Sequence, residues 1–182
     1  FAVFEMGMNA PGEIRTLSKW VRADVAVITS IGQAHLEGVG SLEGVAHAKG
    51  ELFETLAPQS IAICPSSAEQ LAHLKAVGGS KLRTVGVLEH DTCRIINQRL
   101  ENDASVVEFS LDGQTYELRL PCIGAHHISN ALCALMAVSA LGLAVAPCIE
   151  ALSDFELPEM RGQRFTLPDG IEVSLDCYNA NP

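Results

Sequence analysis

Residues 24–56, DVAVITSIGQAHLEGVGSLEGVAHAKGELFETL, join an apolar strand to a helix through a glycine-rich loop. The run 24–31 predicts a buried strand, and the apolar spacing over 41–56 predicts a helix. Ser41 is the expected N-cap of this helix, and Glu43 stands in its first turn, where the helix dipole favours an anion. A strand followed by a loop and a helix is the repeating unit of a parallel α/β sheet.

The same alternation continues on both sides of this unit. Further strands are expected at 1–6, 60–64, 82–87, 164–167 and 171–176, and further helices at 12–21, 68–76, 126–141 and 146–153. The sequence therefore predicts an α/β fold with a mostly parallel sheet flanked by helices. Residues 92–120 are expected to form a small antiparallel β appendage, because 106–120 alternate around an Asp112-Gly113 turn.

The composition describes an acidic chain with the length of one ordinary domain. Of 182 residues, 12 are Lys or Arg and 22 are Asp or Glu, so the formal net charge is −10. This charge has the wrong sign for a nucleic-acid surface or an anionic membrane, and no run reaches the roughly 18 apolar residues of a membrane helix. The six cysteines are far apart, as is typical of reduced thiols in the cytosol. We therefore expect a cytoplasmic monomer without a nucleic-acid partner or membrane insertion.

Three polar residues are expected where strands end. Glu5 closes the first predicted strand, His35 follows the second, and Asp176 closes the last. Open α/β sheets bind ligands at the carboxyl ends of their strands, so these side chains are expected at a functional edge. Each residue alone is more often structural. Their joint placement with Lys49 makes a divalent-metal site for phosphate chemistry an equal alternative.

Lys49 lies in the apolar stripe of the predicted helix at 41–56, four residues after Val45 and three before Leu52. Two interpretations are open. Either the side chain reaches the helix edge and solvent, or it is a desolvated amine with a lowered pKa that can react or stand beside a metal-bound phosphate.

Two glycine-rich stretches look like phosphate-binding loops but lack the required pattern. Residues 38–44 do not have the G-x-G-x-x-G spacing and contain a glutamate, while 78–81 lack the upstream glycine, a Ser or Thr after the lysine and a following helix. The chain contains no complete G-x-x-x-x-G-K-[ST] loop.

Four stretches, 5–14, 28–53, 124–131 and 176–182, resemble the ATP-dependent Mur ligases of peptidoglycan synthesis, in the order of that family. AHLEG followed by AKGE, and the final YNANP, are the specific motifs, and they are most similar to the branch that adds D-alanyl-D-alanine. The resemblance implies that 1–177 are a central ATP-binding domain, N-terminally truncated and without its P-loop segment. It also implies that 92–120 are a β insert and that 178–182 are the hinge to an absent C-terminal domain.

The resemblance also implies an enzyme and a reaction. ATP would phosphorylate the terminal carboxylate of UDP-N-acetylmuramoyl-tripeptide, and the amine of D-alanyl-D-alanine would attack the acyl phosphate to form an amide. Mg²⁺ is the implied cofactor and ATP the co-substrate. Because the phosphate loop is missing, the chain alone is expected to be inactive.

The roles of individual residues follow from the same resemblance. Glu5 and His35 match ligands of magnesium, and Lys49 matches a lysine that carbon dioxide converts to a carbamate, which helps to hold a second magnesium ion. Asn9 matches a position near the peptide. The implied nucleotide contacts are Asn130 (adenine), Asp176 (ribose), Arg164 (phosphates), and Tyr178 and Asn179 (flanking the adenine).

The sequence departs from the family pattern at four positions. His127 stands where an asparagine is usual, and Leu175 replaces an acidic residue beside Asp176. Ser30 replaces an asparagine and Ala10 a histidine. None of these changes a proposed magnesium ligand, but the first two bear on adenine and ribose binding.

Two alternatives stay open. The parent protein could be a relative that adds another residue, of the folylpolyglutamate or cyanophycin synthetase type. It could also be a noncatalytic α/β binding module in which Glu5, His35 and Lys49 are structural.

Overall fold

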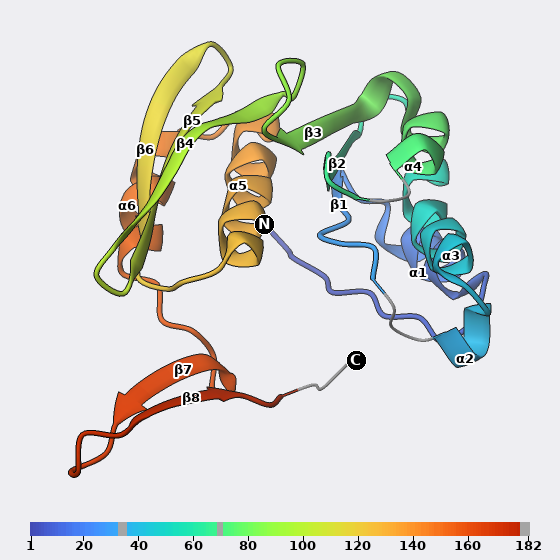
Figure 1. Ribbon diagram of the computed structural model, residues 1–182. Coiled ribbons are helices and arrows are strands. Elements are labelled where there is room, and N and C mark those ends of the chain that lie inside the picture. The colour runs from blue at the N-terminus through green and yellow to red at the C-terminus, as the bar shows by residue number, and fades with distance from the viewer. Residues whose placement is uncertain (33–35, 69–70, 179–182) are drawn as a thin grey trace.

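Three parallel strands start a six-stranded sheet in the computed structural model, which describes residues 1–32, 36–68 and 71–178 (Figure 1). These strands are β1 (Val25–Val27), β2 (Ile61–Pro65) and β3 (Leu82–Gly86), and they lie in that order. Their register pairs Ala26 with Ala62 and Ile63 with Arg83. The predicted α/β class with parallel strands is confirmed.

The antiparallel part continues the same sheet. β4 (Cys93–Glu101) begins parallel to β3 and then pairs antiparallel with β5 (Ala104–Leu111), which pairs with β6 (Gln114–Leu120). The predicted Asp112-Gly113 turn is present, with both residues at positive φ, as a tight hairpin requires. The predicted antiparallel region is therefore confirmed, and it extends the parallel sheet because β4 pairs with β3 on one edge and with β5 on the other.

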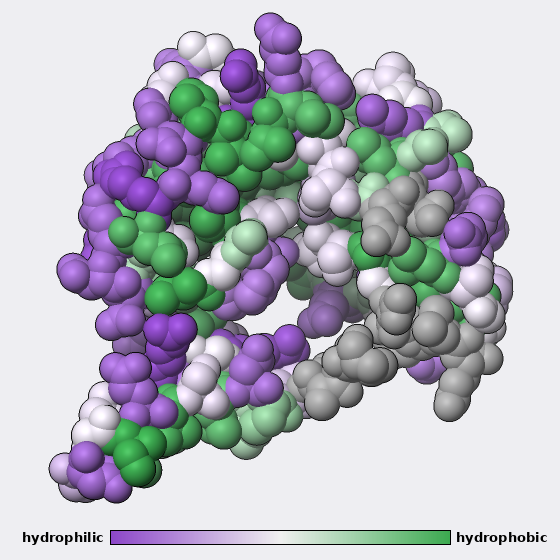
Figure 2. Space-filling model, in the orientation of Figure 1, coloured by the Kyte–Doolittle hydropathy of each residue, from purple (hydrophilic) through white to green (hydrophobic). Residues whose placement is uncertain are grey.

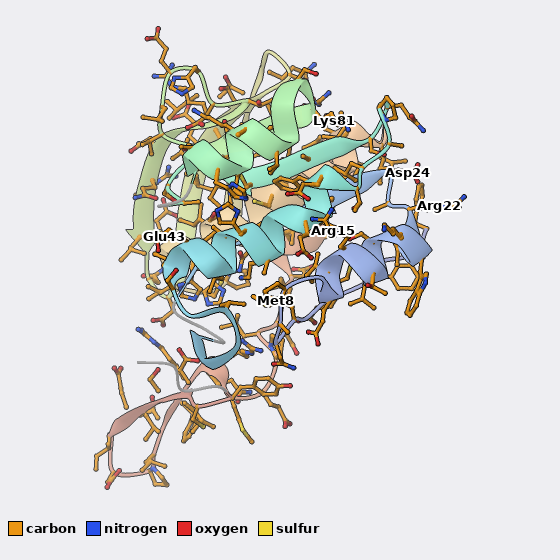
Figure 3. All side chains as sticks on the ribbon, turned by 90° about the vertical axis from the view of Figure 1, so that its right-hand side faces the viewer. Met8, Arg15, Arg22, Asp24, Glu43 and Lys81 are labelled. Carbon is orange, nitrogen blue, oxygen red and sulfur yellow. The ribbon has the colours of Figure 1, made fainter. Side chains whose placement is uncertain are left out.

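Helices cover both faces of the sheet. α5 (Ala125–Ala140) and α6 (Val145–Ser153) lie on one side, and α1 (Glu13–Val21), α3 (Leu42–Glu54) and α4 (Leu71–Gly78) lie on the other (Figure 1). A short helix, α2 (Leu36–Val39), precedes α3, and a 3₁₀ turn (Gly79–Lys81) follows α4. Figure 3 looks onto α3, with α1 and α4 beside it.

Two large apolar clusters fill the space between these layers. Phe109 and Leu132 are fully buried between the sheet and α5, and Phe53 and Leu74 are fully buried on the α3 and α4 side. Burial of this apolar surface drives the layers together. The sheet therefore separates the two cores.

The start of α3 follows the sequence-based prediction. Ser41 is the N-cap, and its hydroxyl oxygen accepts a hydrogen bond from the Gly44 N–H at 3.1 Å. This bond satisfies one of the amides that a helix start leaves unpaired. Val45 and Phe53 are completely buried, as their positions in the stripe predicted.

The strand predicted at 1–6 is wrong. These residues form no strand, and Phe1, Val3 and Phe4 are exposed. An extended apolar segment becomes a strand only if it shares a ladder of backbone hydrogen bonds with a neighbour. No such bond joins residues 1–6 to the rest of the described chain.

The last two strands form a ribbon outside the main sheet. β7 (Arg161–Thr166) and β8 (Glu172–Asp176) pair antiparallel, and the ribbon extends away from the sheet (Figure 1). Figure 2 shows open space between part of the ribbon and the main body. The prediction that Asp176 ends a strand of the parallel sheet is wrong. Among the described strands, β8 pairs with β7 alone, in a separate two-stranded sheet.

All six cysteines are free, and Cys64, Cys93, Cys122 and Cys133 are buried, as the sequence indicated. Burial raises the pKa of Cys64, Cys93 and Cys133 to about 12, so these thiols are protonated at neutral pH. None of the described helices is both long enough and apolar enough to cross a membrane.

Candidate functional site

Lys49 connects α3 to the segment that follows β1. Its side chain is half-buried, and its amine donates a hydrogen bond to the backbone carbonyl of Ser30 at 2.8 Å. Burial lowers the pKa of Lys49 below its usual value. At the same pH, the neutral, nucleophilic fraction of the Lys49 amine is therefore larger than that of an exposed lysine.

The loop at 7–12 lies between α1 and α2. Glu13 accepts hydrogen bonds from the Asn9 N–H at 2.7 Å and the Ala10 N–H at 3.2 Å. The backbone of Asn9 approaches α2 so closely that a Cβ on Gly38 would lie 1.7 Å from the Asn9 carbonyl oxygen. Only glycine at position 38 permits this contact without a shift of the loop.

Glu5, another predicted magnesium ligand, has no hydrogen bond or ion pair with Lys49 in the part of the chain that the structure describes. Glu5 is exposed in the segment 1–6, and no hydrogen bond or ion pair joins it to another described residue. His35 lies outside the described residues. Within the ranges that the structure describes, no three His, Cys, Asp or Glu side chains form a metal-binding group.

A second polar cluster lies where the start of α5 meets the β7 and β8 ribbon. The rings of His126 and His127 are 4.0 Å apart between centroids. Burial and the nearby His126 lower the pKa of His127, while the carboxylate of Asp176 opposes this shift. The first turns of α5 and the end of β8 therefore come together. Asn130, on the second turn of α5, is exposed.

Arg161, which was not predicted as a site residue from the sequence, is the arginine next to Asp176. The two residues face each other in the register of β7 and β8. The Arg161 guanidinium also lies over the Tyr178 ring, 4.3 Å from its centroid, which is a cation–π contact. Gly162, at φ +76°, stands where the ladder shifts by one residue, and this bulge is a local signal that sequence alone does not reveal.

Arg164, the arginine predicted to reach the phosphates, has an acidic partner in this structure. Its guanidinium forms an exposed ion pair with Asp103, in the turn between β4 and β5, at 3.5 Å. The contact reaches from the ribbon to the turn between β4 and β5, but such an exposed pair contributes little stability. Asn179, the other predicted contact beside Tyr178, lies outside the described residues.

Glu51 is a buried polar residue that the sequence analysis missed. Its carboxylate accepts hydrogen bonds from the Gly12 N–H at 2.8 and 3.1 Å and from the Arg15 N–H at 3.0 Å. Gly12 is the N-cap of α1 and offers no side-chain acceptor. A glycine N-cap is a signal that the amides at a helix start need an acceptor from elsewhere. The acceptor itself could not be identified without the fold.

Comparison with known proteins identifies the family of this domain. The Mur ligase middle domain model matches residues 1–138. The chain belongs to this Mur ligase family. The resemblance drawn from the sequence motifs is therefore confirmed at the level of the family.

Relatives of this Mur ligase domain match it from end to end. The UDP-N-acetylmuramoyl-tripeptide–D-alanyl-D-alanine ligase of Bacillus subtilis is 31% identical over 181 residues, and that of Escherichia coli is 32% identical over 187. Each match covers 100% of this chain, but only 38% and 40% of the respective relative. The crystal structure of MurF from Acinetobacter baumannii superimposes with a TM-score of 0.91 at 28% identity, over 99% of this chain and 39% of that one. The chain therefore spans about two fifths of the length of these relatives.

Proposed function

We propose that this chain is the central ATP-binding domain of a ligase that joins D-alanyl-D-alanine to UDP-N-acetylmuramoyl-tripeptide. ATP activates the terminal carboxylate of the tripeptide as an acyl phosphate, and the amine of D-alanyl-D-alanine displaces the phosphate. The products are the amide, ADP and phosphate. The reaction takes place in the cytoplasm, which supplies the ATP.

One observation carries this proposal. Ligases with this named activity in two distant bacteria match the whole chain at 31% and 32% identity. Lys49 supports the proposal from the structure, because burial lowers the pKa of its half-buried amine and reaction with carbon dioxide needs the neutral amine. A noncatalytic binding module would not need a lysine with a lowered pKa in the segment after a parallel strand.

The donor chemistry of the proposed metal site suits magnesium. Mg²⁺ prefers oxygen ligands and usually keeps several waters. Glu5 supplies a carboxylate, carbamylated Lys49 would supply a second anionic oxygen group, and His35 is the third proposed ligand. Lys49 also stands beside an oxygen, the carbonyl of Ser30. Bound Mg²⁺ would neutralise charge on the phosphates and the carboxylate.

The chain itself would orient the nucleotide. We assign Asn130 to the adenine and Asp176 to the ribose, with Tyr178 and Asn179 beside the adenine. We assign the phosphate contact to Arg161 in place of Arg164, because Arg161 faces Asp176 and lies over Tyr178, whereas Arg164 is paired with Asp103.

The test uses the full-length protein and mass spectrometry of the product. The expected product is the tripeptide precursor extended by D-alanyl-D-alanine, formed only when ATP, Mg²⁺ and both substrates are present. Lys49→Ala should lose most activity and regain part of it with added short carboxylates, which replace the carbamate. Lys75→Ala, at an exposed position on α4, is the matched control and should keep activity.

Other outcomes would select one of the rival functions. Transfer of glutamate to a folate, with no reaction on the muramoyl tripeptide, would indicate the folylpolyglutamate synthetase type. Formation of a cyanophycin-like polymer would indicate the cyanophycin synthetase type. A full-length protein that consumes no ATP with any of these substrates would favour the noncatalytic module. The 182-residue chain alone should not hydrolyse ATP, because it contains no G-x-x-x-x-G-K-[ST] loop.

A further inference from the structure

Glu51 caps a helix that belongs to a distant part of the sequence. It lies on α3, and the amides it satisfies belong to Gly12 and Arg15 at the start of α1, 39 and 36 positions earlier. Glu51 is only 8% exposed, so these hydrogen bonds form largely out of water. The positive end of the α1 dipole stabilises the buried carboxylate. The contact is therefore a strong link between two helices, not a surface pair.

The link continues into the loop at 7–12. Beyond Gly12, the Glu13 carboxylate holds the Asn9 and Ala10 amides. These two bonds lower the pKa of Glu13, because they favour its ionised form. On its other side the loop presses against Gly38 of α2. The start of α1 and the loop are thus held between α3 and α2.

We propose that Glu51 is a positioning residue that holds together the three segments carrying the proposed magnesium ligands. Lys49 is two residues before Glu51 on α3. Residues 1–6, which carry Glu5, lead directly into the loop at 7–12, and α2 begins immediately after His35. This inference rests on the proposed function, and it adds a residue that does not contact metal or substrate.

The shape of the contact requires a carboxylate. Both oxygens of Glu51 accept hydrogen bonds from backbone N–H groups. In Glu51→Gln, one oxygen becomes an NH₂ group that faces an N–H donor, so at least one bond is lost and the negative charge disappears. The loop and α1 would then shift relative to α3.

The expected kinetic effect concerns the metal and not the nucleoside. In the full-length enzyme, Glu51→Gln should lower kcat by between about tenfold and a hundredfold, the loss caused by a displacement of about 1 Å at an active site. The Mg²⁺ concentration for half-maximal activity should rise at least about fivefold, because the segments that carry the proposed ligands would shift relative to one another. The KM for ATP should stay within about twofold, since the proposed nucleoside contacts are on α5 and the ribbon.

Glu54→Gln provides a matched control on the same helix. Glu54 is three residues further along α3, and its partner is the Arg15 side chain, which lies beside α3 in Figure 3. The pair is partly exposed, and such pairs contribute little. The kcat and the Mg²⁺ dependence of Glu54→Gln should remain within about twofold of wild type. Glu13→Gln weakens the same loop from an exposed position and should give a smaller version of the Glu51→Gln effect.

The outcomes separate this inference from the proposed function. An active wild type, with a folded Glu51→Gln variant of unchanged kcat and Mg²⁺ dependence, overturns the positioning role and leaves the proposed ligase intact. If Glu51→Gln does not fold, Glu13→Gln decides, and unchanged Mg²⁺ dependence in that variant overturns the role. A wild type without ligase activity overturns both.

Discussion

The Lys49 amine donates a hydrogen bond to the backbone carbonyl of Ser30, 19 residues earlier, at 2.8 Å. The bond brings a helix side chain to the segment that follows the first parallel strand. The lysine is half-buried, so it neither escapes fully to solvent nor lies in the apolar core. An amine in this position is accessible to carbon dioxide and partly desolvated.

We predict that Lys49 forms a carbamate at a lower pH than an exposed lysine does. Burial lowers its pKa, so its neutral fraction at any pH below the usual lysine value is larger. With ¹³C-labelled bicarbonate at about pH 8, well below the ordinary lysine pKa, NMR should show a carbamate signal. The signal should disappear in Lys49→Ala and remain in Lys75→Ala. A signal that survives in Lys49→Ala would assign the carbamate to another amine.

We predict that Arg161 matters more than Arg164 for ATP binding. Arg161→Ala should raise the KM for ATP of the full-length enzyme at least about tenfold, the usual effect of losing a charge-assisted hydrogen bond. Arg164→Ala loses only the exposed pair with Asp103 and should change the KM by about twofold or less. Steady-state kinetics with varied ATP measures both. The opposite ranking would support the assignment made from the sequence.

We predict that His73 makes the fold less stable in mild acid. Burial lowers its pKa, the neighbouring His47 adds to the effect and Glu54 opposes it. Its buried Nε2 atom has no hydrogen-bond partner among the described residues. The folded protein binds a proton on His73 less tightly than the unfolded chain does. The stability that neutral His73 contributes is therefore present above about pH 6.5 and is lost as the pH falls through the folded pKa of His73.

Thermal unfolding at several pH values tests the role of His73. The unfolding temperature of the wild type should be lower at about pH 5.5 than at about pH 7.5, two values on either side of the ordinary histidine pKa. This decrease should be smaller in His73→Gln. His90→Gln, at an exposed position after β3, is the control and should keep the wild-type dependence. An identical pH dependence in His73→Gln and wild type would exclude His73 as the cause.

We predict a large loss of stability when the core beside α5 is truncated. Leu132 is fully buried between α5 and the sheet, so Leu132→Ala should lower the free energy of unfolding by about 2–5 kcal/mol. Leu143→Ala removes the same atoms from a side chain that is 41% exposed and should cost less than about 1 kcal/mol. Urea unfolding measures both values. Equal losses would mean that the two positions are similarly buried in solution.

Local features were predictable because neighbouring residues decide them. Ser41 caps α3 with its own side chain, and Asp112 and Gly113 both take the positive φ angles of a tight turn. The parallel strands β1, β2 and β3 follow from apolar runs that alternate with helices. Lys49 was recognised because one helical stripe contained a single cation. These signals depend on spacings of a few residues.

The sequence by itself determined the α/β class, the cap of α3, the hairpin turn and the motifs of the Mur ligase family. Only the tertiary structure decided that residues 1–6 form no strand, that β4 joins the two parts of the sheet, and that Arg161 meets Asp176. It also decided that Glu51 holds the start of α1. The physical reason is that pairing between strands and capping between helices depend on partners far apart in the chain. Residue spacing does not specify which strand edge a given strand will pair with, or which unpaired helix amide a given side chain will cap.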